Sequence, residues 1–232
     1  MKTLLTAGII ALFIAGGFNA PAQTNTSLAK TNDSGIAVSI VYDGSGSMAD
    51  SVPGENNQQT PKYIIANKAI LSIIRQLVAF SQDKHVNVQG GLVYFLDGHI
   101  HQGIPLVDLT PQSEVSFKDW AHHFNAPSGG TPLGVAIREA QTQLGQSQSL
   151  HKHILVITDG ASNLGIRPEQ VLHEIRSSAN PIPVYFVAFD VTTRIFIPVK
   201  AEGATVVSAS DEAQLNVEIN HILGQKILLE SE

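Results

Sequence analysis

The sequence predicts an α/β fold, a three-layer αβα sandwich around a mostly parallel central sheet with one antiparallel edge strand. Apolar segments rich in β-branched residues alternate along the chain with segments whose apolar residues have helical spacing. The apolar segments contain few polar positions, as expected of strands that helices cover on both faces. A chain of 232 residues with 43% hydrophobic content can bury one medium-sized core but is too short for two large domains.

Five segments have the composition of buried parallel strands. They are 36–42, 86–96, 153–158, 183–189 and 205–208. Between the second and third lies Asp97-Gly98, a hairpin turn signal, followed by a further strand-like run, Ile100–Leu109. Pro105 within this run cannot donate to a strand ladder, so we expect the run to form the antiparallel edge strand.

Four segments are predicted to be helices. They are 61–80, 131–144, 168–177 and 211–223. The second opens with Thr131-Pro132, which predicts a threonine N-cap followed by proline at the first helical position. Helices placed between parallel strands imply right-handed crossovers, and such sheets bind ligands at the carboxyl ends of their strands.

The N-terminus has the features of a secretory signal peptide, residues 1–22. An apolar run from Ala7 to Phe18 follows Lys2 and is too short to span a bilayer, and Ala20 and Ala22 form a cleavage pattern. We expect cleavage near Ala22, a flexible leader 23–34, one domain over 35–224 and a tail 225–232 that extends the last helix, adds a strand or docks elsewhere. The mature chain is predicted to have no membrane span and to be secreted or periplasmic in a bacterium.

Composition excludes several kinds of function. The absence of cysteine rules out disulfides, thiolate zinc sites and thiol nucleophiles. A formal net charge of -6 leaves no excess of basic side chains to neutralise the phosphates of a nucleic acid, so no nucleic-acid partner is expected. Because the chain has no cysteine, any metal must be bound by oxygen or imidazole.

The loop after the first strand, Asp43-Gly44-Ser45-Gly46-Ser47-Met48, carries the strongest functional pattern. One carboxylate and two hydroxyls alternate with glycines that let the backbone curl, so three hard oxygens can face one point. Mg²⁺ and Mn²⁺ prefer such ligands. Taken alone, the loop is equally compatible with a plain turn in which Asp43 and Ser45 bond their own backbone.

Two more polar positions belong to the same predicted sheet edge. Ser128-Gly129-Gly130-Thr131 places a hydroxyl before a helix, and Asp159-Gly160 follows the third strand. Each has an ordinary explanation, Thr131 as an N-cap and Asp159-Gly160 as a turn. Each ordinary explanation is plausible for one position alone. It is less plausible that Thr131, Asp159 and the first loop all lie at one sheet edge without forming a shared site.

This combination resembles the metal-ion-dependent adhesion site of von Willebrand factor type A domains, over about 36–223. The resemblance implies a Rossmann-like fold and a divalent cation, Mg²⁺ or Mn²⁺ with Ca²⁺ possible. It implies five metal ligands, Asp43, Ser45, Ser47, Thr131 and Asp159, with Thr131 and Asp159 changing between direct and water-mediated contact. It also implies a protein partner whose Glu or Asp completes the metal shell, near the flanking residues Gly44, Gly46, Met48, Gly130 and Gly160.

The predicted function is thus a non-enzymatic adhesion or protein-binding module. One alternative is a metal-dependent hydrolase at the same ion, although Glu55 is the only His or Glu close to these loops in sequence. Another is a structural subunit of a cell-envelope assembly. The polar insert 49–60 either shapes partner choice or is a solvated loop.

Two further expectations concern the histidine pairs and the position of Asp43. Zinc sites at His99/His101, His122/His123 or His151/His153 lack a third ligand at a regular spacing. Asp43 is expected at a strand end outside the core, so that Asp43→Ala would abolish metal binding without unfolding the sheet.

Overall fold

The computed structural model describes residues 35–231, and the predicted signal peptide 1–22 and leader 23–34 lie outside them. Six strands form the central sheet in the order β5-β4-β1-β6-β7-β8. Their bounds are β1 Ile36–Asp43, β4 Val88–Leu96, β5 His99–Asp108, β6 His151–Thr158, β7 Val184–Phe189 and β8 Thr205–Ala209. Within this sheet only β4 and β5 pair antiparallel, and β5 is an edge strand. The predicted fold class and edge strand are confirmed.

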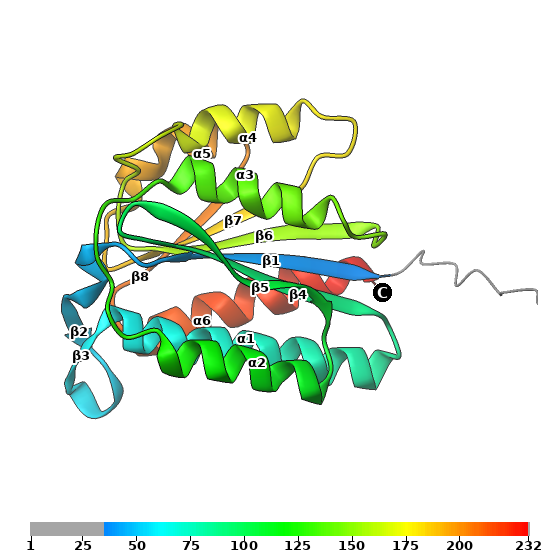
Figure 1. Cartoon of the computed structure of the whole chain (residues 1–232), viewed down its shortest axis with the longest axis horizontal. Helices are drawn as coiled ribbons and strands as arrows, with labels where there is room; N and C mark the ends of the chain where they lie inside the picture. Colours follow the sequence, from blue (N-terminus) through cyan, green and yellow to red (C-terminus); the bar gives the residue numbers. More distant parts are fainter. Residues whose placement is uncertain (1–34, 232) are drawn as a thin grey trace, which may run out of the picture. The chain divides into compact units, whose positions relative to one another are not determined.

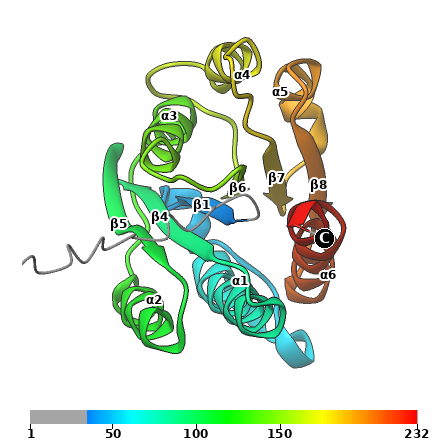
Figure 2. The ribbon, with the colours of Figure 1, turned by 90° about the vertical axis from the view of Figure 1, so that its right-hand side faces the viewer.

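Helices cover both faces of this sheet (Figures 1 and 2). They are α1 Lys62–Lys84, α2 Pro111–His123, α3 Leu133–Leu144, α4 Pro168–Arg176, α5 Ile197–Ala201 and α6 Glu212–Ile222. Helices α1, α2 and α6 lie on one face, and α3, α4 and α5 lie on the other. Helix α2 is longer than the short helical stretch expected from the sequence around Trp120, His122 and His123. Its start is fixed by a capping box between Thr110 and Ser113 and by Pro111 at its first position.

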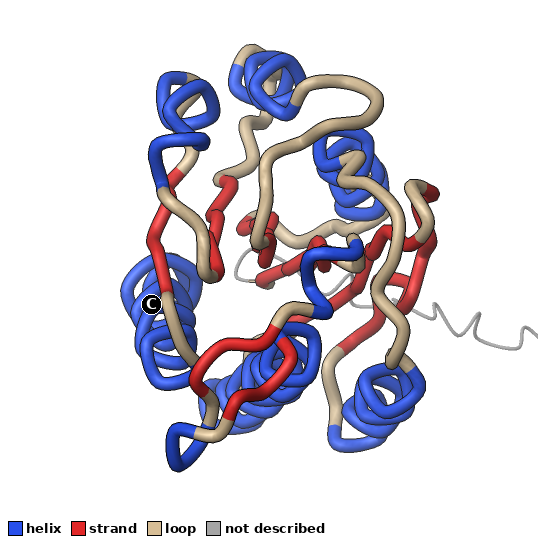
Figure 3. The backbone as a smooth tube through the Cα atoms, turned by 90° about the vertical axis from the view of Figure 1, so that its left-hand side faces the viewer, coloured by secondary structure: helices blue, strands red, loops and turns tan. Residues whose placement is uncertain are grey.

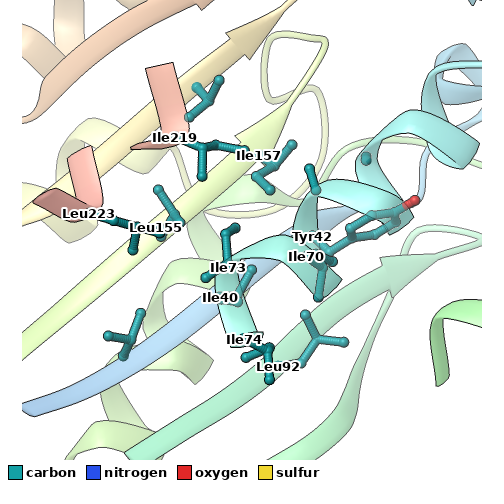
Figure 4. Packing of buried hydrophobic residues seen from close by; sticks show 14 of the residues in the cluster. Ile40, Tyr42, Ile70, Ile73, Ile74, Leu92, Leu155, Ile157, Ile219 and Leu223 are labelled. Atoms are coloured by element: carbon teal, nitrogen blue, oxygen red, sulfur yellow. The ribbon is translucent and has the colours of Figure 1, made fainter. Parts of the chain in front are cut away.

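The alternation of side chains along β1 divides the core into two parts. Ile40 and Tyr42 belong to the cluster that includes α1 and α6, whereas Ala37 and Val41 belong to the cluster that includes α3 and α4. Figure 4 shows the first cluster, with Ile40 near Ile73 of α1. Each isoleucine that is fully buried in this way contributes about 2 kcal/mol to folding. All eight residues of β1 are buried, as predicted for a strand covered on both faces.

Helix α1 is, among residues 35–231, the one helix that is long and apolar enough to cross a membrane. Half of the most apolar 18-residue stretch of this helix is buried inside the domain. Ile70, Ile73 and Ile74 have no exposed surface and pack in the core. The apolar character of α1 is therefore explained by its place on the sheet.

The insert 49–60 is structured. Strands β2 (Ser51–Pro53) and β3 (Gln59–Pro61) form an antiparallel hairpin around a short turn of 3-10 helix, Glu55–Asn57. Val52 is buried in the main core, and the backbone N–H of Glu55 donates to Oε2 of Glu212 at 2.9 Å. The insert is thus anchored to α6 and is not a plain solvated loop.

The C-terminal tail extends the last helix, which decides among the three alternatives left open by the sequence. A π-helical turn, Leu223–Ile227, continues α6 and is followed by a 3-10 turn, Leu228–Ser231. Ile227 is fully buried in the core cluster. Part of the predicted tail therefore belongs to the packed domain.

Candidate metal centre

Three loops meet at the end of the sheet where β1 and β6 finish, the end that faces the viewer in Figure 3. The loop after β1 is joined to the loop before α3 by two backbone hydrogen bonds, from Gly46 N–H to Gly129 O (3.1 Å) and from Ser128 N–H to Gly44 O (2.8 Å). The same first loop reaches the loop after β6, because Ser47 Oγ donates to Oδ1 of Asp159 at 2.8 Å. The structure thus brings together all three loops predicted from the sequence.

Asp43 is fully buried, which corrects the expectation that it lies outside the core. Its Oδ1 accepts the backbone N–H of Ser45 at 2.8 Å, and its Oδ2 accepts the hydroxyl of Thr158 at 2.5 Å. Burial, and secondarily the charge of Asp159, raises the pKa of Asp43 to about 6. A desolvated carboxylate of this kind favours a nearby cation. Thr158 directly precedes Asp159 in the sequence but is not among the site residues predicted from it.

The two serine hydroxyls face each other across the first loop. Ser45 Oγ and Ser47 Oγ are 3.2 Å apart. The close approach of this loop to β4 requires glycine at position 44, where a Cβ would lie 2.2 Å from the carbonyl oxygen of Phe95. Ser47 Oγ therefore has Asp159 on one side and Ser45 Oγ on the other, on a tightly constrained backbone.

Thr131 is buried in the loop before α3 and is held through its backbone. Its N–H donates to Oδ1 of Asn163 at 2.8 Å, and its carbonyl oxygen accepts the N–H of Asn163 at 3.1 Å and the hydroxyl of Ser162 at 3.1 Å. Helix α3 begins at Leu133 without a side-chain cap, so the prediction that Thr131 is the N-cap is wrong. Its hydroxyl makes no hydrogen bond within the described part of the chain. Asn163, which the sequence analysis did not single out, positions Thr131.

Lys62, at the start of α1, also contacts the site. Its ammonium lies 2.7 Å from Oδ2 of Asp159, and both side chains are almost completely buried. Oδ2 receives no well-directed hydrogen bond, so this contact is an ion pair whose geometry leaves Oδ2 incompletely satisfied. Burial alone would lower the pKa of Lys62, but Asp159, Asp190 and Asp50 together raise it above its usual value.

The five residues expected to contact a partner divide by exposure. Gly46 is exposed, and Gly130 and Gly160 are partly exposed, so their surfaces are accessible. Gly44 is buried, and Met48 has no exposed surface and packs in the core. The expectation that Gly44 and Met48 contact a partner is therefore corrected, because neither presents surface to one.

The donor set fits a hard divalent cation. Ser47 Oγ lies 3.2 Å from Ser45 Oγ and 2.8 Å from Oδ1 of Asp159, so three oxygens of the predicted set are close together. The buried Oδ2 of Asp159 lacks a directed hydrogen-bond donor. Mg²⁺ and Mn²⁺ prefer such oxygens and retain several waters. Asp43 and Asp159 supply negative charge while the hydroxyls supply neutral oxygens.

The histidine pairs do not form a comparable site. Within residues 35–231 no three His, Asp or Glu side chains are arranged to hold a metal ion. Glu230 Oε2 lies 3.5 Å from a ring nitrogen of both His151 and His153, but burial lowers the pKa of His153 to about 4, so this ring is neutral at neutral pH. Both ring nitrogens of His153 lack a hydrogen-bond partner within the described domain.

Glu55, the possible general base of a hydrolase, points elsewhere. Its carboxylate lies 3.7 Å from the ammonium of Lys68, in the cluster that includes Glu212. No contact joins it to Asp43, Ser47 or Asp159 among the described residues.

The family model described as the von Willebrand factor type A domain matches residues 37–218. A search among curated proteins found no match.

Among solved structures, the D319A mutant of the PilB minor pilin from Streptococcus sanguinis has a TM-score of 0.66 at 18% identity, covering 86% of this chain and 63% of that chain. The vWF domain of the type V pili tip protein Mfa5 from Porphyromonas gingivalis has a TM-score of 0.67 at 12% identity, covering 86% and 97%. A von Willebrand factor type A protein from Catenulispora acidiphila has a TM-score of 0.65 at 20% identity, covering 84% and 43%. This chain thus spans less than two thirds of the PilB and Catenulispora structures, and these similarities show a shared fold.

Proposed function

Because the chain belongs to the von Willebrand factor type A domain family, we propose that it is a protein-binding module that captures an acidic side chain through a divalent cation. The residues that would hold Mg²⁺ or Mn²⁺ are Asp43, Ser45, Ser47, Thr131 and Asp159. The observation that carries this proposal is the hydrogen bond from Ser47 to Asp159, which joins the first and third loops at 2.8 Å.

Each residue has a distinct part in this proposal. Asp43 and Asp159 supply negative charge, and burial of Asp43 makes it costly for its carboxylate to stay uncompensated. Ser45, Ser47 and Thr131 supply neutral oxygens, which leave the site electrophilic enough to attract an outside carboxylate. A bound cation would supply the positive charge for that attraction. The accessible backbone of Gly46, Gly130 and Gly160 would lie beside the incoming side chain.

The proposed setting is adhesion outside the cell. Three structural neighbours are described as a minor pilin, a type V pili tip protein and a pilus adhesin, SpaC from Lactobacillus rhamnosus GG. Their fold is shared at low identity, so a surface role for this chain is an inference by analogy. The predicted signal peptide 1–22 supports the same setting, with the mature chain secreted or periplasmic.

Calorimetric titration of Mg²⁺ and Mn²⁺ into chelator-treated protein tests this proposal. Asp43→Asn keeps the shape of the side chain and removes its charge, so we expect one-site binding in the wild type and none in this variant. Asp83→Asn is the matched control, because Asp83 is exposed at the far end of α1. Absence of binding in the wild type, or unchanged affinity in Asp43→Asn, would contradict the metal assignment.

A further inference from the structure

A lysine ammonium already lies at the carboxylate that the proposed metal would use. Lys62 Nζ is 2.7 Å from Oδ2 of Asp159, 3.6 Å from Oδ2 of Asp190 and 3.9 Å from Oδ2 of Asp50. Asp50 and Asp190 are largely or partly exposed, whereas Lys62 and Asp159 are almost completely buried. The closest and most desolvated of these contacts is therefore the one with the predicted metal ligand.

The fold fixes the position of this lysine. Lys62 is the first residue of α1 and follows Pro61 at the end of the β2–β3 hairpin. Its backbone N–H donates to the carbonyl oxygen of Asp50 at 2.8 Å, which ties the start of the helix to the loop after β1. Burial of the side chain removes the freedom that makes most surface ion pairs weak. The ammonium is thus a fixed part of the site.

We propose that Lys62 is a tethered cation of this site, which neutralises Asp159 when no divalent cation is bound and competes with that cation for Asp159. This inference rests on the proposed function of the same site, and it assigns Lys62 the role of setting metal affinity.

Electrostatics gives the direction of the effect. A divalent cation held by Asp159 would meet the positive charge of Lys62 across the same carboxylate, and like charges at close range in a poorly solvated site repel strongly. Without Lys62, Asp43 and Asp159 would form a pair of uncompensated neighbouring carboxylates, which repel each other and attract a cation. Both effects make metal binding weaker with Lys62 than without it.

Calorimetry of Mg²⁺ binding to Lys62→Met tests the competition. Methionine keeps the length of the side chain and removes the charge, so we expect affinity on the order of tenfold tighter than the wild type or more. Lys68→Met is the matched control, because Lys68 lies on the same helix and its loss changes the net charge equally. The Lys68 ammonium pairs with Glu212 at 3.0 Å, outside the site, so its variant should bind Mg²⁺ as the wild type does.

Thermal unfolding separates this role from that of an ordinary structural ion pair. In chelator, Lys62→Met should unfold at a lower temperature than the wild type, and Mg²⁺ should raise its unfolding temperature by more than that of the wild type. Adding Asp159→Asn to Lys62→Met should restore stability in chelator, because the uncompensated carboxylate is gone. An equal loss of stability with and without Mg²⁺ would indicate a structural pair and overturn the proposal.

Each outcome of the titrations decides the matter. Tighter binding in Lys62→Met supports the proposal, and binding in this variant but not in the wild type supports it while contradicting the proposed function of the native chain. Equal or weaker binding in Lys62→Met overturns the proposal and leaves the proposed function intact. Absence of binding in both overturns both. If Lys62→Met folds neither with nor without Mg²⁺, Lys62→Gln, which keeps a polar group for Asp159, takes its place with the same expectations.

Discussion

The hydroxyl of Ser47 donates a hydrogen bond of 2.8 Å to Oδ1 of Asp159, which lies 112 residues further along the chain. The contact follows from the sheet. Strands β1 and β6 are parallel neighbours, with Tyr42 paired to Ile157, so the residues just beyond both strands emerge at the same edge. Each parallel strand contributes one loop to this edge, and Ser47 and Asp159 are where two of those loops meet.

The hydroxyl of Thr131 should matter more for the metal than for folding. Thr131→Val keeps the side-chain shape, and because the hydroxyl makes no hydrogen bond in the described domain, the free energy of unfolding should change by no more than about 0.5 kcal/mol. Mg²⁺ affinity should fall by up to about tenfold, or 1.4 kcal/mol, and by less than in Asp43→Asn. Urea titration and calorimetry measure the two quantities. A loss of affinity as complete as that of Asp43→Asn would contradict the expected variable contact of Thr131.

Asn163 should stabilise the loop that carries Thr131. Asn163→Ala removes the acceptor of the Thr131 N–H and should lower the free energy of unfolding by about 1 kcal/mol, because Asn163 is exposed and water replaces part of the lost bond. Asn180→Ala, at another exposed loop position, is the control. Urea titrations of both variants give the comparison, and equal small effects in the two would argue against a positioning role for Asn163.

Asp43 should destabilise the metal-free domain at neutral pH. Its pKa is about 6 in the folded protein against an ordinary value of 3.8, so the folded state holds a proton that the unfolded state releases. The stability from this group is present below pH 3.8 and is lost as the pH rises through about 6. In chelator at pH 7, Asp43→Asn should therefore be more stable than the wild type by about 1–3 kcal/mol. Urea titration at pH 7 and pH 4 should show that this advantage shrinks in acid, and a constant difference would refute the shift.

His153 should have the opposite pH dependence. Burial, and secondarily His151, lowers its pKa from 6.5 to about 4, so between these values the unfolded state binds a proton that the folded state excludes. Stability from the neutral ring is present above pH 6.5 and is lost as the pH falls toward 4. The free energy of unfolding of His153→Leu, taken relative to that of the wild type, should therefore be about 2 kcal/mol higher at pH 5 than at pH 8. The control is His122→Leu at an exposed position of α2, and the same pH response in both variants would contradict this assignment.

Local patterns in the sequence determined the fold class and much of the candidate site. Apolar runs such as Ile36–Tyr42 predict buried strands because their composition requires cover on both faces, and the turn at Asp97-Gly98 predicts the antiparallel edge strand. Since parallel strands end at one edge, the order of strands and loops along the chain was enough to predict that the loops carrying Asp43, Thr131 and Asp159 meet. Whether those residues hold a metal remains a prediction.

Tertiary packing alone decided which further side chains contact the site residues and which of the residues expected to contact a partner are buried instead. Lys62 is the first residue of α1, directly after the insert and Pro61. Nothing in the neighbouring sequence indicates that its ammonium contacts Asp159. Asn163 and Met48 are similar cases, one positioned against Thr131 and the other buried in the core. Local periodicity specifies which face of an element is apolar, but contacts between distant segments depend on how helices and loops pack over the completed sheet, and no short stretch of sequence contains that information.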